Sequence, residues 1–393
     1  MNYDKYIAKT VSEIPPSGIR KFFDIASEMD DVISLGVGEP DFNTPWNICE
    51  TAIYAIETGK THYTSNYGTT PLRQEIAAYL NDRFSLQYDI NQIVVTVGAS
   101  EALDIAFRSI INPGDEVLVP APSYVSYMPG VKLAGGEAVP VLTVAKNAFK
   151  YTADMLKSVI TPKTKAIILP FPNNPTGAVM TREELLGIVD VIIENDLIVI
   201  SDEIYSELTY DGKHTSIASL PGMQERTIVI NGFSKAFAMT GWRLGFVAAP
   251  LALTKAMVKI HQYTILCAPS AAQEAGLEAL KSERRNGFKQ VKDMVSQYDY
   301  RRRYLLEAFN AIGLICFEPK GAFYMFPNIQ ISGLSSDEFC ERLVKEKKVA
   351  CVPGTAFGEG GEGFIRCSYA SSMENLKEAV KRIAEFLKEN GWI

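Results

Sequence analysis

The sequence has few of the features that suit a protein to a membrane or a nucleic acid. None of its apolar stretches is long enough to span a bilayer. Residues 1–6 lack the basic and apolar regions of a signal peptide, so a cytoplasmic protein is the default expectation. Acidic side chains outnumber basic ones by 46 to 39, and the short basic run at 301–303 reads as a solvated helix face or a subunit contact. We therefore expect neither nucleic acid nor membrane among its partners.

Histidine and cysteine are too scattered to indicate a metal site. The three histidines lie far apart in the sequence, and none of the six cysteines forms a Cys-x-x-Cys pair. The cysteines are Cys49, Cys267, Cys316, Cys340, Cys351 and Cys367. We expect free thiols in a reducing compartment, most of them small apolar core residues, and no bound metal.

A Gly-x-Gly-x-x-Gly string at the first strand–helix unit is also missing, which argues against a dinucleotide-binding dehydrogenase. What the sequence does contain, from residue 91 onward, is an alternation of short apolar runs with helical patterns. The runs predict strands at 93–97, 116–120, 165–170, 197–201, 227–230 and 244–248. Such alternation is typical of a mostly parallel sheet with helices on both faces.

Past residue 313 the pattern changes to an α+β layout. Here strands are predicted at 313–317, 322–326 and 364–368, and helices at 336–347 and 373–389. Two further helices are predicted earlier in the chain, near 21–29 and at 286–312. A chain of 393 residues can form two or three domains. We interpret 1–46 as an N-terminal arm and part of a small domain, 47–287 as a large domain, and 288–393 as the rest of the small domain.

Four polar strings each follow a predicted strand. Gly98-Ala99-Ser100 opens a helix, where free backbone N–H groups can bind a phosphate, although Ser100 could simply cap the helix. Asn174 lies in a string that turn chemistry alone could explain. Asp202 follows a buried strand, where a carboxylate is unfavourable unless it meets a cation or caps a helix.

The fourth string contains Lys235, between an apolar strand and Ala-Phe-Ala-Met. Such surroundings disfavour a charged amine, and a neutral amine can form a Schiff base with an aldehyde, although a surface lysine at a loop tip is the other interpretation. Because the carboxyl ends of parallel strands meet at one edge of a sheet, we expect the four strings to lie together. Arg366, in the strand at 364–368, needs a carboxylate ligand or a structural ion pair.

The string Ser234-Lys235, followed by 241–245 (Gly-Trp-Arg-Leu-Gly), resembles the lysine signature of class I/II aminotransferases, fold-type-I enzymes that depend on pyridoxal 5'-phosphate (PLP). The resemblance runs from Ser34 to Arg366 and is strongest to the bacterial and archaeal branch of aromatic and aspartate aminotransferases, with a PatA-like aminotransferase as the nearest likeness. It implies an α/β fold: a large domain with a mostly parallel seven-stranded sheet sandwiched by helices, plus a smaller α+β domain. It also implies a homodimer with shared active sites.

The resemblance further implies a role for each polar string. Lys235 would be the catalytic residue that holds PLP as a Schiff base, Asp202 would hold the proton on the ring nitrogen, and Asn174 with Tyr205 would contact the phenolic oxygen. The cofactor-binding residues would be Gly98, Ala99, Ser100, Tyr124, Asn174, Asp202, Tyr205, Ser234, Lys235, Arg243 and, from the neighbouring subunit, Tyr63. The substrate would be bound by Gly38, Asn174 and Arg366, with Arg366 on its α-carboxylate.

The implied reaction moves the amino group of an L-amino acid to a 2-oxo acid, with 2-oxoglutarate expected as the acceptor, by a ping-pong mechanism. Aromatic, aspartate-like and N-acetyl-diaminopimelate-like donors all remain open, with Ile19, Tyr63, Arg108 and Tyr127 as unranked candidates for contacting the donor side chain. A PLP-dependent carbon–sulfur β-lyase is the alternative, because the same electron sink serves both reactions. A ligand-sensing regulator with this domain normally carries a DNA-binding segment in front, for which the match leaves no room.

Overall fold

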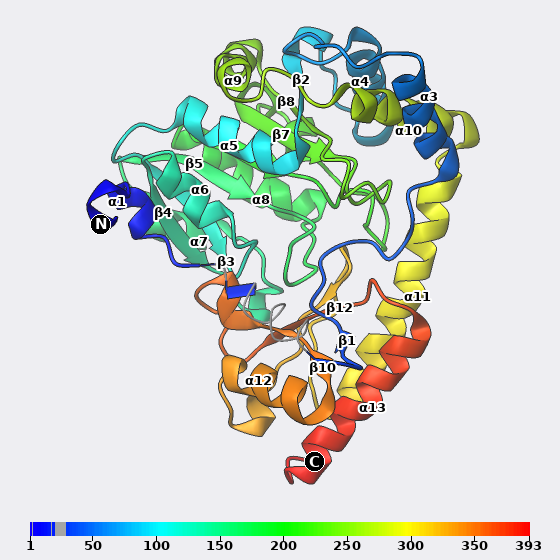
Figure 1. The fold of residues 1–393 in the computed structure, drawn as a ribbon. Coiled ribbons are helices and arrows are strands. Elements are labelled where there is room, and N and C mark those ends of the chain that lie inside the picture. The colour runs from blue at the N-terminus through cyan, green and yellow to red at the C-terminus, as the bar shows by residue number, and fades with distance from the viewer. Residues whose placement is uncertain (2, 17, 20–28) are drawn as a thin grey trace.

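The computed structural model describes residues 1, 3–16, 18–19 and 29–393. The helix predicted near 21–29 therefore lies almost entirely outside the described residues. Figure 1 shows a larger part built around a broad sheet and a smaller part that contains the C-terminus. Among the described residues, no helix combines the length and the apolar character that crossing a membrane requires.

The broad sheet has seven strands in the order β2-β8-β7-β6-β5-β3-β4. Their bounds are β2 Ile93–Thr96, β3 Glu116–Ala121, β4 Glu137–Leu142, β5 Thr164–Leu169, β6 Ile198–Asp202, β7 Thr227–Gly232 and β8 Gly245–Ala248. Neighbours pair in parallel except at β8, which is antiparallel to both β2 and β7. The prediction of a mostly parallel seven-stranded sheet is confirmed, and the seventh strand is β4, which was not predicted.

Helices cover both faces of this sheet, and the strand sequences explain why. Strands β2, β7 and β8 are mostly apolar and are buried along their whole length, as expected for a sheet packed on both sides. In β3, for example, Leu118 packs into one core while Val117 and Val119 pack into the other. The helices of this part are α3 Trp46–Glu57, α4 Thr70–Phe84, α5 Gly98–Ile110, α6 Tyr127–Leu133, α7 Ala153–Val159, α8 Arg182–Glu194, α9 Leu251–Thr264 and α10 Ser270–Asn286.

The smaller part combines short strands with long helices around its own apolar core. Its strands are β1 Ile33–Ser34, β9 Tyr324–Met325, β10 Val349–Ala350, β11 Val352–Pro353 and β12 Ile365–Ser368, and its helices are α11 Lys289–Ala311, α12 Ser336–Lys347 and α13 Met373–Glu389. The order β11-β12-β9 forms an antiparallel sheet, and β1 pairs in parallel with β10. We propose the boundaries 1–46, 47–287 and 288–393 for the domains, which the separate sheets support.

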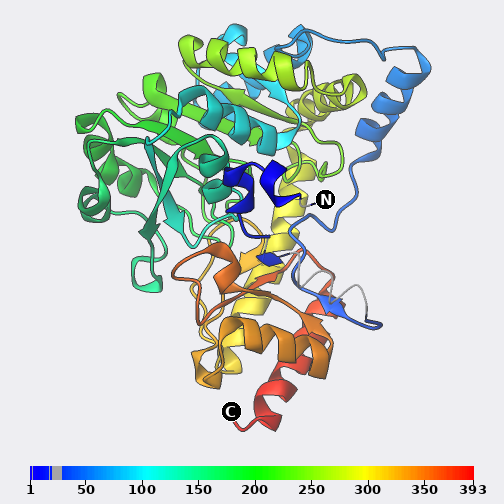
Figure 2. The same ribbon diagram turned by 60° about the vertical axis from the view of Figure 1, so that its left-hand side comes forward.

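Near the N-terminus, the short helix α1 (Lys9–Ser12) lies away from β1. Figure 2 shows it against the larger part, and Lys132 at the end of α6 forms an ion pair with Glu13 directly after α1, with 2.9 Å between Nζ and Oε2. Further along the sequence, Ile33 of β1 pairs with Val349 of β10 in the smaller part. The first residues of the chain therefore contact both parts.

Two local predictions differ from the structure. The long helix expected at 286–312 is interrupted by Gly287 and Phe288, both with positive φ, so that α10 ends at Asn286 and α11 starts at Lys289. The strand expected at 313–317 is reduced to a single bridge between Cys316 and Pro327.

Candidate active site

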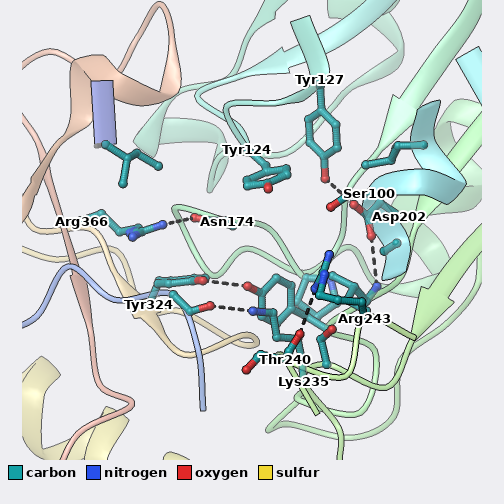
Figure 3. Close-up of a pocket in the computed structure, with 18 residues that line it drawn as sticks. Ser100, Tyr124, Tyr127, Asn174, Asp202, Lys235, Thr240, Arg243, Tyr324 and Arg366 are labelled. Carbon is teal, nitrogen blue, oxygen red and sulfur yellow. Dashed lines mark hydrogen bonds between the residues drawn. The ribbon is translucent and has the colours of Figure 1, made fainter. Parts of the chain in front are cut away.

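A cavity of about 280 Å³ lies where the carboxyl ends of the parallel strands face the smaller part. Figure 3 shows side chains from both parts pointing into it. Its lining comprises Ile19, Gly38, Ala99, Ser100, Leu103, Tyr124, Tyr127, Pro172, Asn174, Asp202, Ile204, Tyr205, Ser234, Lys235, Thr240, Arg243, Tyr324 and Arg366. Residues from at least six different segments thus converge on one space.

One end of the cavity is suited to an anion. Helix α5 begins directly after β2, and the N–H groups of its first turn have no partner within the helix. The Arg243 guanidinium lies beside this turn and donates from Nη1 to the Thr240 carbonyl oxygen at 2.9 Å. A Cβ on Gly98, whose φ is +74°, would lie 2.8 Å from Arg243 Nη2. Glycine therefore lets the backbone and the guanidinium approach each other closely, an arrangement suited to an anion.

Asp202 ends β6 and is 5% exposed. Its Oδ2 accepts a hydrogen bond from the Tyr127 hydroxyl at 2.8 Å, and its Oδ1 accepts one from the Ile204 N–H at 3.2 Å. Burial raises the pKa of this carboxyl to about 6, against the two hydrogen bonds, which lower it. A buried carboxylate that faces a cavity is stabilised by a cation placed in that cavity.

Lys235 lies just after β7, and its amine donates to the Gly38 carbonyl oxygen at 2.6 Å. The amine lies 5.6 Å from the ring centroid of Tyr205 and 5.6 Å from that of Phe323. The pKa of the Lys235 amine is lowered to about 8, and burial is the largest cause. Among the neighbouring charges, Glu39 raises this pKa and Arg366 lowers it. A sizeable fraction of this amine is therefore neutral near pH 8, as a nucleophile or a general base requires.

Arg366 lies on β12 at the opposite end of the cavity and is 2% exposed. Its Nη1 donates to Asn174 Oδ1 at 3.0 Å, and its Nη2 donates to the Gly36 carbonyl oxygen at 2.5 Å. The guanidinium lies over the Tyr324 ring, 4.5 Å from the centroid, whereas its buried Nε has no hydrogen-bond partner. A buried cation surrounded only by neutral acceptors is well suited to a carboxylate ligand.

Two tyrosines from distant segments meet between these ends. The hydroxyls of Tyr205 and Tyr324 lie 2.7 Å apart, and burial raises the pKa of both phenols. The Tyr124 ring packs edge-on against Tyr127, with 5.5 Å between centroids, and also faces the cavity. The space between α5 and Arg366 is therefore bounded by aromatic rings and hydroxyls.

Most of the site residues predicted from the sequence lie together around this cavity. Those that line it are Gly38, Ala99, Ser100, Tyr124, Asn174, Asp202, Tyr205, Ser234, Lys235, Arg243 and Arg366, and Gly98 adjoins Arg243. Tyr63 does not line it and is 85% exposed. Of the remaining candidates for contacting the donor side chain, Ile19 and Tyr127 line the cavity, whereas Arg108 is exposed and pairs with Asp104.

Sequence reasoning missed several lining residues, of which Tyr324 and Thr240 make polar contacts. Tyr324 lies in an apolar run that predicts a strand, and a hydroxyl within such a run was the available signal. Thr240 lies within the lysine string, where its carbonyl oxygen accepts from Arg243 and its hydroxyl donates to Glu39 Oε2 at 3.0 Å. Glu39 is 201 residues away in the chain, so no local pattern reveals this contact.

Comparison with known proteins agrees with this geometry. The chain matches the family described as aminotransferase class I and II over residues 30–383. It is 55% identical to the putative aminotransferase YugH of Bacillus subtilis, with 97% of this chain and 98% of the relative covered. It is 50% identical to an aspartate aminotransferase of Pyrococcus abyssi, with 96% and 97% covered. The crystal structure of an aromatic aminotransferase from Pyrococcus horikoshii matches with a TM-score of 0.90 at 47% identity, covering 95% of this chain and 100% of that chain.

The fold and the cavity define an enzyme of fold type I that uses pyridoxal 5'-phosphate. The chain belongs to the class I and II aminotransferases and transfers amino groups. Its residues fit the cofactor, because the cavity offers an anion site at the start of α5, a buried carboxylate at Asp202 and an amine of lowered pKa at Lys235.

Proposed function

We propose that this enzyme moves the amino group of an L-amino acid to a 2-oxo acid, with 2-oxoglutarate as the acceptor, by a ping-pong mechanism. The observation that carries the proposal is the placement of Lys235, Asp202 and Arg366 around one cavity. Lys235 supplies an amine for the aldehyde of the cofactor, and Asp202 supplies an anion for its pyridine nitrogen. Arg366 supplies a guanidinium for the carboxylate of the amino acid.

Separate groups of residues would hold the parts of PLP. Ser100, Ser234, Arg243 and the first-turn amides of α5 would bind its phosphate, and the carboxylate of Asp202 would pair with its protonated ring nitrogen. The Tyr124 ring would stack on the pyridine, while Asn174 and Tyr205 would contact the phenolic oxygen. When bound, PLP supplies an electron-withdrawing ring that stabilises negative charge at the substrate's α-carbon.

The substrate α-carboxylate would bind Arg366, whose Nε has no partner and whose Nη1 contacts Asn174. This arrangement would place the α-carbon between Arg366 and Lys235. Because burial lowers the pKa of the Lys235 amine to about 8, its Nζ can accept the α-proton and release it again near neutral pH. The Gly38 carbonyl oxygen, 2.6 Å from Nζ, orients the amine in the cavity.

We also propose that two copies of the chain share their active sites. Tyr63 and Tyr263 are 85% and 86% exposed. Their segments adjoin, since Asn66 Nδ2 donates to the Leu266 carbonyl oxygen at 2.9 Å. Exposed aromatic side chains on adjoining segments favour a protein interface. Tyr63 would then reach the phosphate site of the neighbouring subunit.

The donor is proposed as a class rather than as one compound. Relatives of this chain are named aspartate and aromatic aminotransferases. Another is named a probable N-acetyl-LL-diaminopimelate aminotransferase. Within the cavity, Ile19, Leu103 and Tyr124 offer apolar and aromatic surface for a donor side chain. Aromatic, aspartate-like and N-acetyl-diaminopimelate-like donors are therefore the three classes to compare.

The test is a panel of these donors with 2-oxoglutarate as the acceptor and glutamate as the measured product. Glutamate formation with one donor class and no formation with Lys235→Ala would support the proposal. Release of ammonia from a donor in the absence of any 2-oxo acid would instead indicate elimination and contradict it.

A further inference from the structure

A second buried carboxylate lies directly behind the one that faces the cofactor site. Glu203 follows Asp202 in the chain and is 0% exposed, yet it does not line the cavity. Its Oε1 accepts hydrogen bonds from Ser201 Oγ at 2.9 Å and from Ser216 Oγ at 2.6 Å. Its Oε2 lies 3.1 Å from Nε2 of His214. Glu203 therefore joins the two ends of the segment 201–216, which carries Tyr205 into the cavity.

The contact between Glu203 and His214 is a close approach of a carboxylate oxygen and an imidazole nitrogen rather than an aligned hydrogen bond. Both facing atoms are fully buried, and neither has a hydrogen-bond partner of suitable geometry. The imidazole is packed edge-on against the Phe84 ring, with 5.6 Å between centroids. A buried carboxylate oxygen without a donor is costly, and a protonated imidazole at this distance of 3.1 Å would compensate it even when the angle is poor.

The other ionisable groups around Glu203 are neutral or already paired. Tyr88, from the segment after α4, stays a neutral phenol because burial and the nearby Glu203 raise its pKa. Glu207, further along the same segment, accepts hydrogen bonds from Arg83 at 2.9 and 2.5 Å and from the Tyr79 hydroxyl at 2.9 Å. Among the described residues, His214 is thus the basic side chain that contacts Glu203.

We propose that His214 is a positioning residue that, in its protonated form, cancels the charge of Glu203, so that the neighbouring Asp202 can carry the negative charge facing the cofactor. This inference rests on the proposed role of Asp202 as the partner of the ring nitrogen. Two adjacent buried carboxylates repel each other, so one of them takes up a proton unless a cation offsets the second. The pKa of Asp202 agrees: after burial, which is the largest cause, Glu203 also raises it.

The test measures the dissociation constant of PLP from the cofactor-free protein as a function of pH. Wild type is compared with His214→Gln, Glu203→Gln and the double variant. His214→Gln leaves the carboxylate uncompensated, so we expect the pH below which PLP binding weakens to rise by about one unit, or about tenfold weaker binding within that window. Glu203→Gln should lower that pH, and adding it to His214→Gln should restore binding towards the wild-type profile.

Controls separate charge from structure. Ser216→Ala removes a hydrogen bond to Glu203 without changing charge, so its pH profile should stay at the wild-type position. The inference would be overturned if His214→Gln and Glu203→Gln moved the pH below which PLP binding weakens in the same direction. It would also be overturned if Glu203→Gln left that pH unchanged. If His214→Gln does not fold, Glu203→Gln and the double variant decide the matter.

One further variant distinguishes this inference from the proposed function beneath it. If Asp202→Asn binds PLP as tightly as wild type at every pH, the role of Asp202 itself fails. If Asp202→Asn binds weakly while His214→Gln keeps the wild-type profile, only the role of His214 fails.

Discussion

The amine of Lys235 should react as an unusually acidic lysine in the cofactor-free enzyme. Burial lowers its pKa from 10.5 to about 8. At pH 7 an amine with a pKa of 10.5 is neutral in about one molecule in 3000, whereas one with a pKa of about 8 is neutral in about one in ten. Because only the neutral amine is nucleophilic, Lys235 should react about 300-fold faster at pH 7 than an exposed lysine of equal intrinsic reactivity.

Competitive labelling with acetic anhydride measures this directly. The apoenzyme is labelled at a series of pH values, digested, and the extent of acetylation at Lys235 is followed by mass spectrometry. Peptides with exposed lysines from the same digest serve as the internal standard. Labelling of Lys235 should rise with pH and level off above about 8, while that of the standard continues to rise.

A pair of variants tests the cause of the shift. Glu39 raises the pKa of Lys235 and Arg366 lowers it, so Glu39→Gln should move the midpoint to lower pH and Arg366→Met to higher pH. A wild-type midpoint at the value of an exposed lysine would refute the reasoning. So would a shift of Glu39→Gln to higher pH, because removing an anion cannot stabilise an ammonium.

Three further predictions concern the substrate, the cofactor and the carboxylate. Arg366→Lys should raise KM for donor and acceptor by about tenfold to a hundredfold in steady-state assays, because the paired hydrogen bonds between a guanidinium and a carboxylate are worth about 1.5–3 kcal/mol. An unchanged KM would contradict this. Gly98→Ala should weaken PLP binding in a titration of the apoenzyme, because its φ is +74° and the new Cβ would lie 2.8 Å from Arg243 Nη2; undiminished affinity would count against the phosphate site. The raised pKa of Asp202 means that the folded state holds this proton more tightly than the unfolded chain does. The free energy of unfolding of the apoenzyme should therefore fall by about 3 kcal/mol, from this group, as pH rises from about 4 to about 6. In urea titrations at these pH values, Asp202→Asn should not show this fall.

Elements with strong local signals could be predicted from the sequence. The helices predicted at 336–347 and 373–389 have those bounds in the structure, because Ser335 and Ser372 cap them and an apolar stripe continues to their ends. The parallel sheet followed from the alternation of strands and helices. Its parallel order explains why side chains from distant strings line one cavity.

Features that depend on distant partners could not be predicted in this way. Tyr324 meets Tyr205 across 119 residues, and Tyr127 meets Asp202 across 75, so neither contact leaves a local pattern. The two-residue strands β10 and β11 are too short for periodicity to identify them. The roles of the individual site residues came from the family resemblance and stay predictions until the variants above are measured.

The stretch from Gly36 to Gly38 touches both ends of the cavity at once. Its first carbonyl accepts from Arg366 and its last from Lys235, so three residues of backbone connect the guanidinium to the amine. A substrate carboxylate that took over Nη2 of Arg366 would release the Gly36 carbonyl, two residues before the carbonyl that accepts from the Lys235 nitrogen. One short backbone segment thus serves as an acceptor for the substrate-binding guanidinium and for the reactive amine alike.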